Sequence, residues 1–484
     1  MNSTIASSLW TSKTAAKATG GTSIVDWQAS GVSINSRDIK PGDLFVAIKG
    51  PNFDGHNFVA DALDSGASGA VIDHRPDGLG RNAPLLEVLD TTVALKDLGR
   101  AARQRASAKI IAVTGSVGKT GTKEALHLVL KDQGSCTASL GNFNNHWGVP
   151  LSLSRMSKNT TFGVFEIGMN HPGEITPLVK MVRPHIAVIT NVELVHSEYF
   201  DSVEGIADAK AEIFTGLVDS GVCVLNRDND QFERLQSAAL SVGVKNVISF
   251  GTHAKAQARP IKISKDSFGS DVDVIVGDEE FSYRINCPGQ HWVINSLAVL
   301  ATVYASGGNV SKAAKELENL RGLKGRGAIH SISFSGGSFN IIDESYNAAP
   351  VSMQAAFKVL GSMPIIGRGR RIAILGDMLE LGEDSLAHHE AMVQLLIMER
   401  IDLIFTAGPN MRALFNALPQ SMRGGSALTS QELLAEVLGF IQSGDVILIK
   451  GSAASGTSCI VEALLDMDNS NNSGSKNNKR SAIG

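Results

Sequence analysis

The sequence predicts an α/β protein of several domains, in which short parallel strands alternate with helices. Three observations lead to this expectation. A chain of 484 residues is too long for one ordinary hydrophobic core. Short apolar runs alternate with helical segments from about residue 106, and the same alternation starts again near residue 323. We therefore expect an N-terminal unit over 1–105, a central domain over 106–322, a C-terminal domain over 323–467 and a disordered tail over 468–484.

The N-terminal unit has one strong strand pattern, over Asp43–Ile48, which follows a Pro-Gly turn. A helix is expected over Asn57–Ser65 and a second strand over Ala70–Ile72. Between the first strand and the helix lies a polar, glycine-rich loop, Lys49–His56. Composition alone makes this loop a connector.

The central domain begins with the most informative stretch of the chain. Ile110–Val113 predicts a buried strand, and Thr120–Asp132 predicts a helix. A glycine-rich turn between them can surround a phosphate with backbone N–H groups at a helix N-terminus. Its residues are Thr114, Gly115, Ser116, Val117, Gly118, Lys119, Thr120 and Gly121.

In this turn, Lys119 would lie on the outer phosphates and the Thr120 hydroxyl would reach a Mg²⁺ ion. The spacing differs from the common motif, because Gly115 and Gly118 are only three positions apart. The alternative is an ordinary strand–helix turn. The agreement of strand, turn and helix favours a nucleoside triphosphate site.

Polar residues follow two further strands, which are expected over Phe162–Ile167 and His185–Thr190. Glu166 lies near the end of the first strand, and Asn191 and His196 follow the second. Open α/β sheets bind ligands at these strand ends, and Mg²⁺ prefers oxygen ligands. A lone Glu or His in such a position is more often solvated, so each is only a candidate ligand.

Two other segments of the central domain could carry function. Asn142–Pro150 contains three amides and makes a poor helix and a poor strand, so it suits a loop that hydrogen-bonds a polar ligand. Lys210 lies in a helical pattern over Ala207–Phe214, where the plain interpretation is an exposed lysine.

In the C-terminal domain, expected strands and helices alternate as in a Rossmann-like fold, but there is no Gly-x-Gly-x-x-Gly turn. Its strands are expected over Phe339–Asp343, Arg371–Gly376, Ile401–Phe405 and Asp445–Ile449. From about Asp468 the chain is rich in Asn, Ser and Lys with almost no apolar residues, which predicts disorder.

Composition excludes several classes of protein. The net charge of −4 and the aromatic content of 5% argue against nucleic-acid binding. The four cysteines form no Cys-x-x-Cys pair, so neither a zinc site nor a disulfide framework is expected. No run approaches the ~18 apolar residues of a membrane span, and the N-terminus lacks the apolar region of a signal peptide. We expect a cytoplasmic monomer.

Together these motifs resemble the Mur ligase family over nearly the whole chain, apart from about 20 N-terminal residues and the polar tail. The phosphate loop is shared with other ADP-forming ligases. The Phe53–His56 loop and the Ser345-Tyr346-Asn347 segment indicate the member that ligates D-alanyl-D-alanine. The segments that carry the resemblance are Asn35-Ser36-Arg37, Pro41–Phe45, Phe53–His56, Thr114–Glu124, Gly141–Asn145, Glu166–Asn170, Asn191 with His196, Ala209–Glu212, Gly289–His291 with Asn295, Gly325-Arg326, Asp343–Pro350, Leu375–Gly382 and Lys450–Ser452.

The resemblance implies a UDP-binding N-terminal domain, a central ATPase and a Rossmann-like C-terminal domain that receives the amine. ATP, with Mg²⁺, would phosphorylate the carboxylate of a UDP-N-acetylmuramoyl-tripeptide to an acyl phosphate. The amine of D-alanyl-D-alanine would then attack, giving the pentapeptide precursor of peptidoglycan, ADP and phosphate. The partners would therefore be small-molecule substrates.

The resemblance also implies roles for individual residues. The catalytic group would be Lys119, Lys210, His196 and Glu166. The metals would be bound by Thr120, Glu166, His196 and Lys210, the last as a carbamate. The UDP substrate would meet Ser36, Arg37, Phe53, Asp54, Gly55 and His56, with Asn142, Asn144 and Asn145 near the acyl centre. Beyond the phosphate loop, the nucleotide would meet Asn295, Arg326, Asp343, Glu344, Tyr346 and Asn347.

The chain departs from the family pattern at three places. Asn35 stands where Asp is usual, and His146-Trp147 replaces an acidic and an aliphatic residue. Ala453 stands where Arg is usual after Lys450-Gly451-Ser452, which puts in doubt a role for this loop in binding an anionic group. The alternatives are a related ligase that adds a single amino acid, a folylpolyglutamate synthase or, in another class, a P-loop switch or motor.

Overall fold

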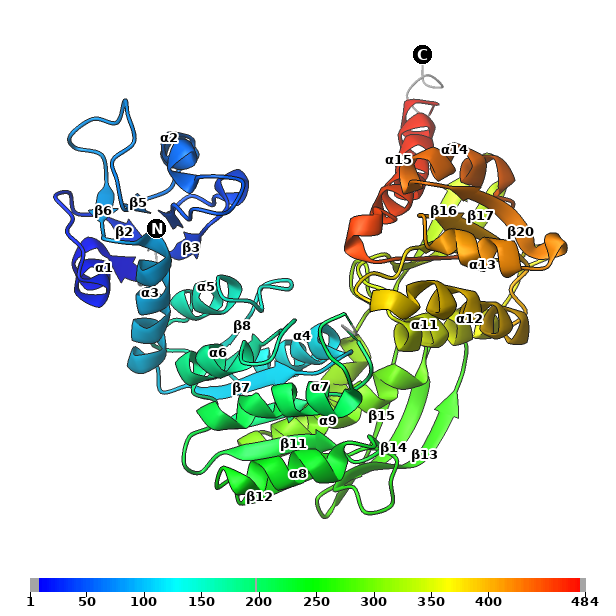
Figure 1. Ribbon diagram of the computed structural model, residues 1–484, viewed down its shortest axis with the longest axis horizontal. Coiled ribbons are helices and arrows are strands. Elements are labelled where there is room, and N and C mark those ends of the chain that lie inside the picture. Colours follow the sequence, from blue (N-terminus) through cyan, green and yellow to red (C-terminus); the bar gives the residue numbers. More distant parts are fainter. Residues whose placement is uncertain (1–7, 196–197, 479–484) are drawn as a thin grey trace.

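The computed structural model describes residues 8–195 and 198–478 of the chain. Figure 1 shows three α/β domains, with the N-terminal domain (blue) and the C-terminal domain (yellow to red) on opposite sides of the central domain. No helix in the described ranges is both long and apolar enough to cross a bilayer. The expected α/β class, with mostly parallel sheets, is confirmed.

The N-terminal domain is a small parallel sheet with strand order β3-β4-β5-β6. All four residues of β4 and of β5 are buried, because helices and loops cover both faces of these strands. One face packs against α1 and α3 and the other against α2. The elements are β1 (Trp10–Thr11), α1 (Ser12–Thr19), β2 (Gln28–Ala29), β3 (Gly31–Ser33), η1 (Ser36–Asp38), β4 (Asp43–Val46), η2 (Gly55–Phe58), α2 (Val59–Asp64), β5 (Gly69–Ile72), β6 (Leu85–Glu87) and α3 (Thr91–Arg105).

The central domain is a nine-stranded sheet with order β15-β14-β13-β12-β11-β10-β7-β9-β8. The strands from β8 to β13 are parallel, whereas β13, β14 and β15 form an antiparallel meander at one edge. One face packs against α4, α9 and α10, and the other against α5, α6, α7 and α8. The elements are β7 (Lys109–Thr114), α4 (Lys119–Lys131), β8 (Cys136–Ala138), α5 (Gly148–Ser154), β9 (Phe162–Glu166), α6 (Ile175–Val182), β10 (Ile186–Ile189), α7 (Val203–Ala211), η3 (Glu212–Gly216), β11 (Val222–Asn226), α8 (Phe232–Ser241), β12 (Asn246–Phe250), β13 (Ala258–Lys265), β14 (Ser270–Val276), β15 (Glu279–Ile285), α9 (Gln290–Ser306), α10 (Val310–Glu316) and η4 (Leu317–Asn319).

The C-terminal domain has strand order β16-β17-β21-β18-β19-β20, in which only the pairing of β16 with β17 is antiparallel. The four strands expected from the sequence are present as β17, β18, β19 and β21, and two edge strands are added. The elements are β16 (Ala328–Phe334), β17 (Gly337–Glu344), α11 (Pro350–Ser362), β18 (Arg371–Gly376), η5 (Gly382–Asp384), α12 (Ser385–Met398), β19 (Leu403–Ala407), α13 (Met411–Ala417), η6 (Gln420–Met422), β20 (Arg423–Ala427), α14 (Ser430–Phe440), β21 (Val446–Lys450), η7 (Ala453–Ser455) and α15 (Ser458–Asn478).

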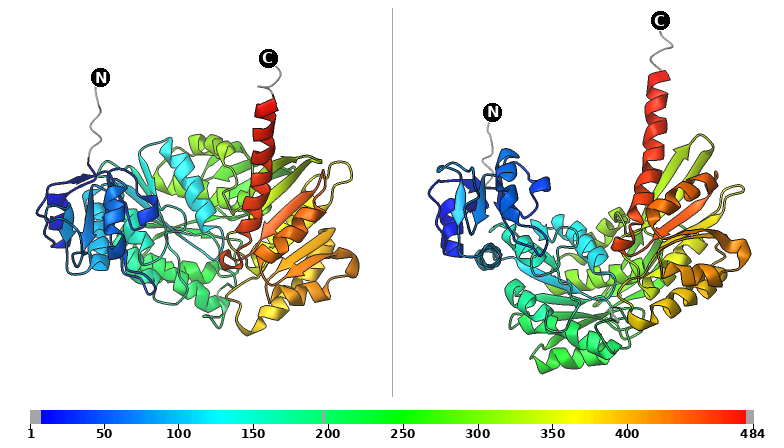
Figure 2. Two further views of the ribbon diagram at one scale, coloured as in Figure 1. Left: turned by 90° about the horizontal axis from the view of Figure 1, so that it is seen from above. Right: turned by 45° about the horizontal axis from the view of Figure 1, so that its top comes forward.

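The expectation of a disordered tail from residue 468 is wrong as far as residue 478, because α15 continues to Asn478. Figure 2 shows this helix projecting away from the C-terminal domain. Its first turns are fixed by buried Ile460, Val461 and Leu464, which pack against the sheet. Once a helix is nucleated, each further residue adds one backbone hydrogen bond, so the polar sequence continues the helix instead of starting one.

Candidate functional site

The glycine-rich turn between β7 and α4 is folded tightly against the end of β10. Gly115 has φ +151°, and a Cβ there would lie 1.9 Å from Thr190 Oγ1. The same Thr190 hydroxyl donates to Val117 O at 2.6 Å, and Ser116 N–H donates to Asn191 O at 2.8 Å. Gly115 is therefore required by close contact as well as by backbone conformation.

Lys119, the first residue of α4, is directed back into this turn. Its ammonium donates to Gly115 O at 2.6 Å and to Ser116 O at 3.5 Å. Burial lowers the pKa of Lys119; the nearby Glu166 charge opposes this shift, and Arg326 adds to it. Both acceptors are neutral carbonyls, so a bound phosphate would supply negative charge directly at a poorly solvated cation.

Glu166 ends β9 and is only 1% exposed. Thr120 Oγ1 donates to its Oε2 at 2.9 Å, and Asn144 Nδ2 donates to its Oε1 at 2.8 Å. Three residues that were selected from separate segments of the sequence therefore meet at one point. The hydroxyl and carboxylate oxygens are the ligand types that Mg²⁺ takes in nucleotide sites.

Lys210 lies on α7 with 2% exposure, so the plain interpretation of an exposed lysine is wrong. Burial lowers its pKa well below the usual value, and the charge of Lys119 lowers it further. Glu212, the acidic residue two positions after Lys210, bonds to another segment, because its Oε2 accepts from Thr176 N–H and from Thr176 Oγ1, each at 2.9 Å. His196, the other candidate metal ligand, lies outside the described residues.

A cleft of about 990 Å³ separates the phosphate loop from the C-terminal domain. On the central side it is lined by candidate residues Ser116, Val117, Gly118, Lys119, Thr120, Gly121, Asn142, Asn144, Glu166 and Asn295. On the other side it is lined by candidate residues Arg326, Glu344, Tyr346 and Asn347. Sequence-selected residues from two domains therefore face one space, and Thr114 lies behind it at the end of β7.

The C-terminal wall of the cleft is supported from inside. The Arg326 guanidinium lies 4.0 Å from the centre of the Tyr346 ring. Asp343 is 1% exposed and accepts from Gly325 N–H at 2.7 Å and from Ser345 Oγ at 2.6 Å. Asp343 thus holds the wall in shape, whereas Arg326 and Tyr346 face the cleft.

Lys450 also lines the cleft, and no role for it was predicted from the sequence. It ends β21 with 1% exposure, lies 3.4 Å from Glu344 Oε2 and donates to Asn347 O at 2.8 Å. Burial lowers its pKa, and Glu344 opposes that shift. The Lys450-Gly451-Ser452 segment was the available signal, but its contact with Glu344 depends on the pairing of distant strands β17 and β21.

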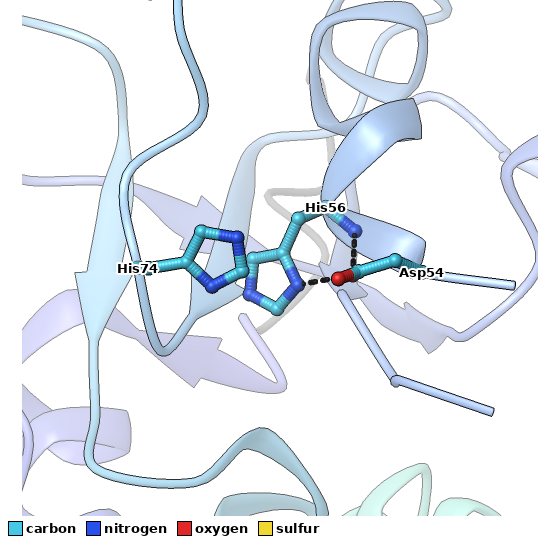
Figure 3. Close-up of side chains that lie close together, drawn as sticks. All are labelled: Asp54, His56 and His74. Atoms are coloured by element: carbon cyan, nitrogen blue, oxygen red, sulfur yellow. Dashed lines mark hydrogen bonds and ion pairs between the residues drawn. The ribbon is translucent and has the colours of Figure 1, made fainter. Parts of the chain in front are cut away.

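The Asp54–His56 part of the N-terminal loop is internally satisfied, as Figure 3 shows. Asp54 Oδ1 lies 3.0 Å from His56 N and 2.7 Å from His56 Nδ1. The other ring nitrogen of His56 accepts from Asp73 N–H at 3.1 Å, and the His74 ring stacks on His56 at 3.9 Å. Because both nitrogens of His56 have hydrogen-bond partners, this Asp–His group fixes the shape of the loop.

The other N-terminal candidates lie outside the cleft. Ser36 and Arg37 form η1, in which Asn35 Oδ1 accepts from Arg37 N–H at 3.1 Å, and Arg37 is exposed. Phe53 makes an edge contact with Trp147 of the central domain at 6.5 Å between ring centres. Gly55 is buried.

Asn145, a candidate of the central domain, also does not face the cleft. Its Oδ1 accepts from the N–H groups of Trp147 and Gly148.

Three family models match the chain: the Mur ligase family catalytic domain over residues 28–110, the Mur ligase middle domain over 113–303, and the Mur ligase glutamate ligase domain over 325–453. A curated relative, the UDP-N-acetylmuramoyl-tripeptide–D-alanyl-D-alanine ligase of Rickettsia prowazekii, is 33% identical over 444 residues, covering 92% of this chain and 97% of that protein. The chain belongs to the Mur ligase family. The predicted resemblance is thus confirmed.

Solved structures extend the similarity to the whole fold. MurF from Acinetobacter baumannii is 30% identical with a TM-score of 0.80, covering 94% of this chain and 99% of that one. MurF from Thermotoga maritima, solved in complex with ADP, is 26% identical with a TM-score of 0.74, covering 91% of this chain and 98% of that one. Mur ligases are ATP-dependent, so the phosphate loop of this Mur ligase agrees with its family.

Proposed function

We propose that this Mur ligase uses ATP to join D-alanyl-D-alanine to a UDP-N-acetylmuramoyl-tripeptide, releasing ADP and phosphate. The observation that carries the proposal is the meeting of Lys119, Thr120 and Glu166 at a cleft that faces the C-terminal domain. The choice of substrates is supported by the full-length similarity to ligases named for this reaction. The enzyme would act as a cytoplasmic monomer.

The chemistry requires activation of a carboxylate, which is a poor electrophile. A carboxylate oxygen of the tripeptide attacks the γ-phosphorus of ATP, and ADP leaves. The amine of D-alanyl-D-alanine then attacks the acyl carbon, phosphate leaves, and the nitrogen loses a proton to give the amide. Lys119 would stabilise the charge that develops on the transferred phosphoryl group.

The residues at Glu166 fit a magnesium ion. Thr120 and Glu166 offer two hard oxygen ligands within 2.9 Å of each other. When bound, Mg²⁺ would neutralise charge on the phosphates. Lys210 would join this site only as a carbamate, because a buried ammonium would repel the ion, whereas a carbamate adds an anionic oxygen. His196 is the remaining proposed ligand.

The substrate would extend from the N-terminal domain to the cleft. Ser36, Arg37 and Phe53 would contact the UDP end, while Asp54, Gly55 and His56 hold the shape of their loop. Asn142 and Asn144 would meet the reacting carboxylate, with Asn145 supporting their loop. The nucleotide would be held between the phosphate loop, from Thr114 to Gly121, and the opposite wall. That set includes Asn295, Arg326, Glu344, Tyr346 and Asn347, with Asp343 behind them.

A coupled ADP-release assay tests the function. UDP-N-acetylmuramoyl-tripeptides that carry either diaminopimelate or lysine are offered with D-alanyl-D-alanine and with single D-amino acids. We expect ADP release only when tripeptide and dipeptide are both present. Turnover with a single amino acid would assign the chain to another ligase of the family, and turnover with ATP alone would contradict the ligase function.

The proposed carbamate has its own test. Lys210→Ala should lose activity and regain part of it when short-chain carboxylic acids are added, because these refill the missing oxygen ligand. Removal of CO₂ should lower the activity of the unaltered enzyme, and bicarbonate should restore it. Full activity of Lys210→Ala would remove this residue from the site.

A further inference from the structure

Lys123 is a buried lysine one turn beyond the phosphate loop, with no role in the chemistry above. Its side chain is 0% exposed. The ammonium donates to Ser139 O at 2.8 Å and to Gly141 O at 3.2 Å, and it pairs with the carboxylate of Glu124. An ammonium group is unfavourable in an interior unless it is paired and hydrogen-bonded, so these contacts account for its position.

The two acceptor carbonyls lie at the start of the loop that carries the cleft asparagines. The same loop is tied to β9 at other points. Ser139 Oγ accepts from Glu166 N–H at 3.2 Å, and Asn144 O accepts from Gly168 N–H at 2.9 Å. Lys123 thus joins α4 to this loop, whereas the other two bonds join the loop to Glu166 at the end of β9 and to Gly168 just beyond it.

The loop has little apolar packing of its own between these bonds. Leu140 is 52% exposed and Phe143 is 38% exposed. Gly141 has φ +49°, and a Cβ there would meet no atom within 4 Å. Hydrogen bonds therefore carry more of the ordering of this loop than side-chain burial does.

These contacts belong to a series of hydrogen bonds that begins and ends on α4. Thr120 and Lys123 are three positions apart on α4 and so project from the same face. Lys123 holds the loop, the loop presents Asn144, Asn144 donates to Glu166, and Glu166 accepts from Thr120. Helix α4 therefore contacts Glu166 in two ways: directly through Thr120, and indirectly through Lys123 and the loop that carries Asn144.

We propose that Lys123 is a positioning residue: its ammonium holds the 139–145 loop so that Asn144 keeps the Glu166 carboxylate turned toward Thr120. Lys123 acts only through Asn144 and touches neither substrate nor nucleotide. The inference rests on the proposed function, because it assigns the oriented carboxylate to the ligase reaction. It also makes a claim about loop order that does not depend on activity.

The test compares Lys123→Met, Asn144→Ala and the double variant with Lys131→Met, which changes an exposed lysine at the other end of α4. Amide hydrogen exchange is followed over 139–145 without substrates. The kcat and KM for the UDP substrate, the KM for ATP and the Mg²⁺ dependence are measured for each protein. We expect exchange in the loop to quicken at least about tenfold in Lys123→Met and to stay unchanged in Lys131→Met.

Activity gives the second readout. Lys123→Met and Asn144→Ala should each lower kcat/KM roughly 10- to 100-fold, the size of a lost charge-assisted hydrogen bond, and should raise the Mg²⁺ requirement. Because Lys123 acts through Asn144, the kcat/KM of the double variant should be close to that of the less active single variant. The proposal would be overturned if the losses in kcat/KM of the two single variants multiplied in the double variant. Unchanged amide exchange over 139–145 in Lys123→Met would also overturn it.

Loss of Lys123 leaves Glu124 without its partner, so a second variant guards against a failure to fold. Lys123→Met with Glu124→Leu removes the whole ion pair, a replacement that proteins often tolerate. The same quickened exchange and the same non-additivity with Asn144→Ala are expected, and their absence would refute the role. If the unaltered enzyme makes no ADP, the proposed function fails, while the exchange result still decides the role of Lys123 in the loop.

Discussion

The two boundaries of the central domain differ in how they are held. At the N-terminal boundary, Trp10 Nε1 donates to Ser154 O at 2.9 Å, and the Arg105 guanidinium lies 4.0 Å from the Trp10 ring. Arg105 also donates to Leu9 O at 2.9 Å and to Met156 O at 3.2 Å. Leu151 of the central domain packs in the same apolar cluster as the N-terminal sheet, so this boundary is built like a protein interior.

At the C-terminal boundary, an open cleft lies between the domains. One hydrogen bond that crosses it, from Glu198 N–H to Glu380 O, is long at 3.4 Å. Charged groups face this space, among them Lys119, Arg326 and Lys450. The N-terminal boundary therefore stabilises the folded chain and holds the two domains at a fixed distance, whereas the cleft leaves charged groups free to contact ligands.

The largest expected effect comes from breaking the cleft side at Lys119. Lys119→Ala should lower kcat/KM at least about a thousandfold, because it removes the cation at the transferred phosphoryl group. Urea unfolding should show no loss of stability, since the variant also removes a buried charge whose pKa burial already lowers. Lys131→Ala on the same helix is the control, and near-normal turnover of Lys119→Ala would show that the loop is wrongly assigned.

The next effect concerns the N-terminal boundary. Arg105→Ala should lower the free energy of unfolding by about 2 kcal/mol, because it removes two hydrogen bonds and the contact with Trp10. The KM for the UDP substrate should rise while the KM for ATP stays the same. As a control, Lys324→Ala breaks an exposed pair with Glu462 and should change stability by less than about 0.5 kcal/mol. If both variants lowered the free energy of unfolding equally, the N-terminal boundary would not be the stabilising one.

A pH dependence should follow from His185, which lies beside the N-terminal boundary. Ile110 N–H donates to His185 Nδ1 at 3.0 Å, and Arg103 on α3 caps the nearby carbonyls of Val182 and Arg183. Burial, with the charges of Arg103, Lys109 and Arg183, lowers the pKa of His185 to about 4. An unfolded histidine has a pKa of about 6.5, so in the window between these values only the unfolded chain binds the proton.

The contribution of His185 to stability is therefore complete above about pH 6.5 and is lost as the pH falls toward 4. Urea midpoints measured across this window should fall more steeply for the unaltered protein than for His185→Asn, which keeps an acceptor but does not titrate. The effect should be modest, because the ring is only half-buried. Parallel slopes for the two proteins would contradict it.

The smallest effect is expected at the end of α15. Truncation after Asp468 should change the free energy of unfolding by less than about 0.5 kcal/mol, because the removed residues are polar. Truncation before Asp468 should cost about 1 kcal/mol more, since its carboxylate accepts from Ser333 N–H at 2.9 Å. A large fall in melting temperature after the shorter truncation would show that the polar end of α15 packs.

The sequence predicted the parts of the site that depend on local order. The strand, turn and helix around Lys119 give a strong pattern within a few residues, and Glu166 follows from strand-end reasoning. The burial of Lys210 was missed, because helical periodicity does not tell which face a neighbouring element covers. Lys450 was missed for a related reason: its partner Glu344 lies 106 positions earlier, and strand pairing over that distance leaves no local signal.

The order of strands in the C-terminal sheet has a consequence for synthesis on the ribosome. The last strand, β21, lies between β17 and β18, which end at Glu344 and Gly376 and are therefore made well before β21 begins at Val446. The phosphate loop can form as soon as the central domain has emerged, but Lys450 reaches Glu344 only after nearly the whole chain is translated. A nascent or prematurely ended chain would therefore carry a finished nucleotide-binding turn with an unfinished opposite wall. Translation itself would delay the competence of this enzyme until its final strand is inserted.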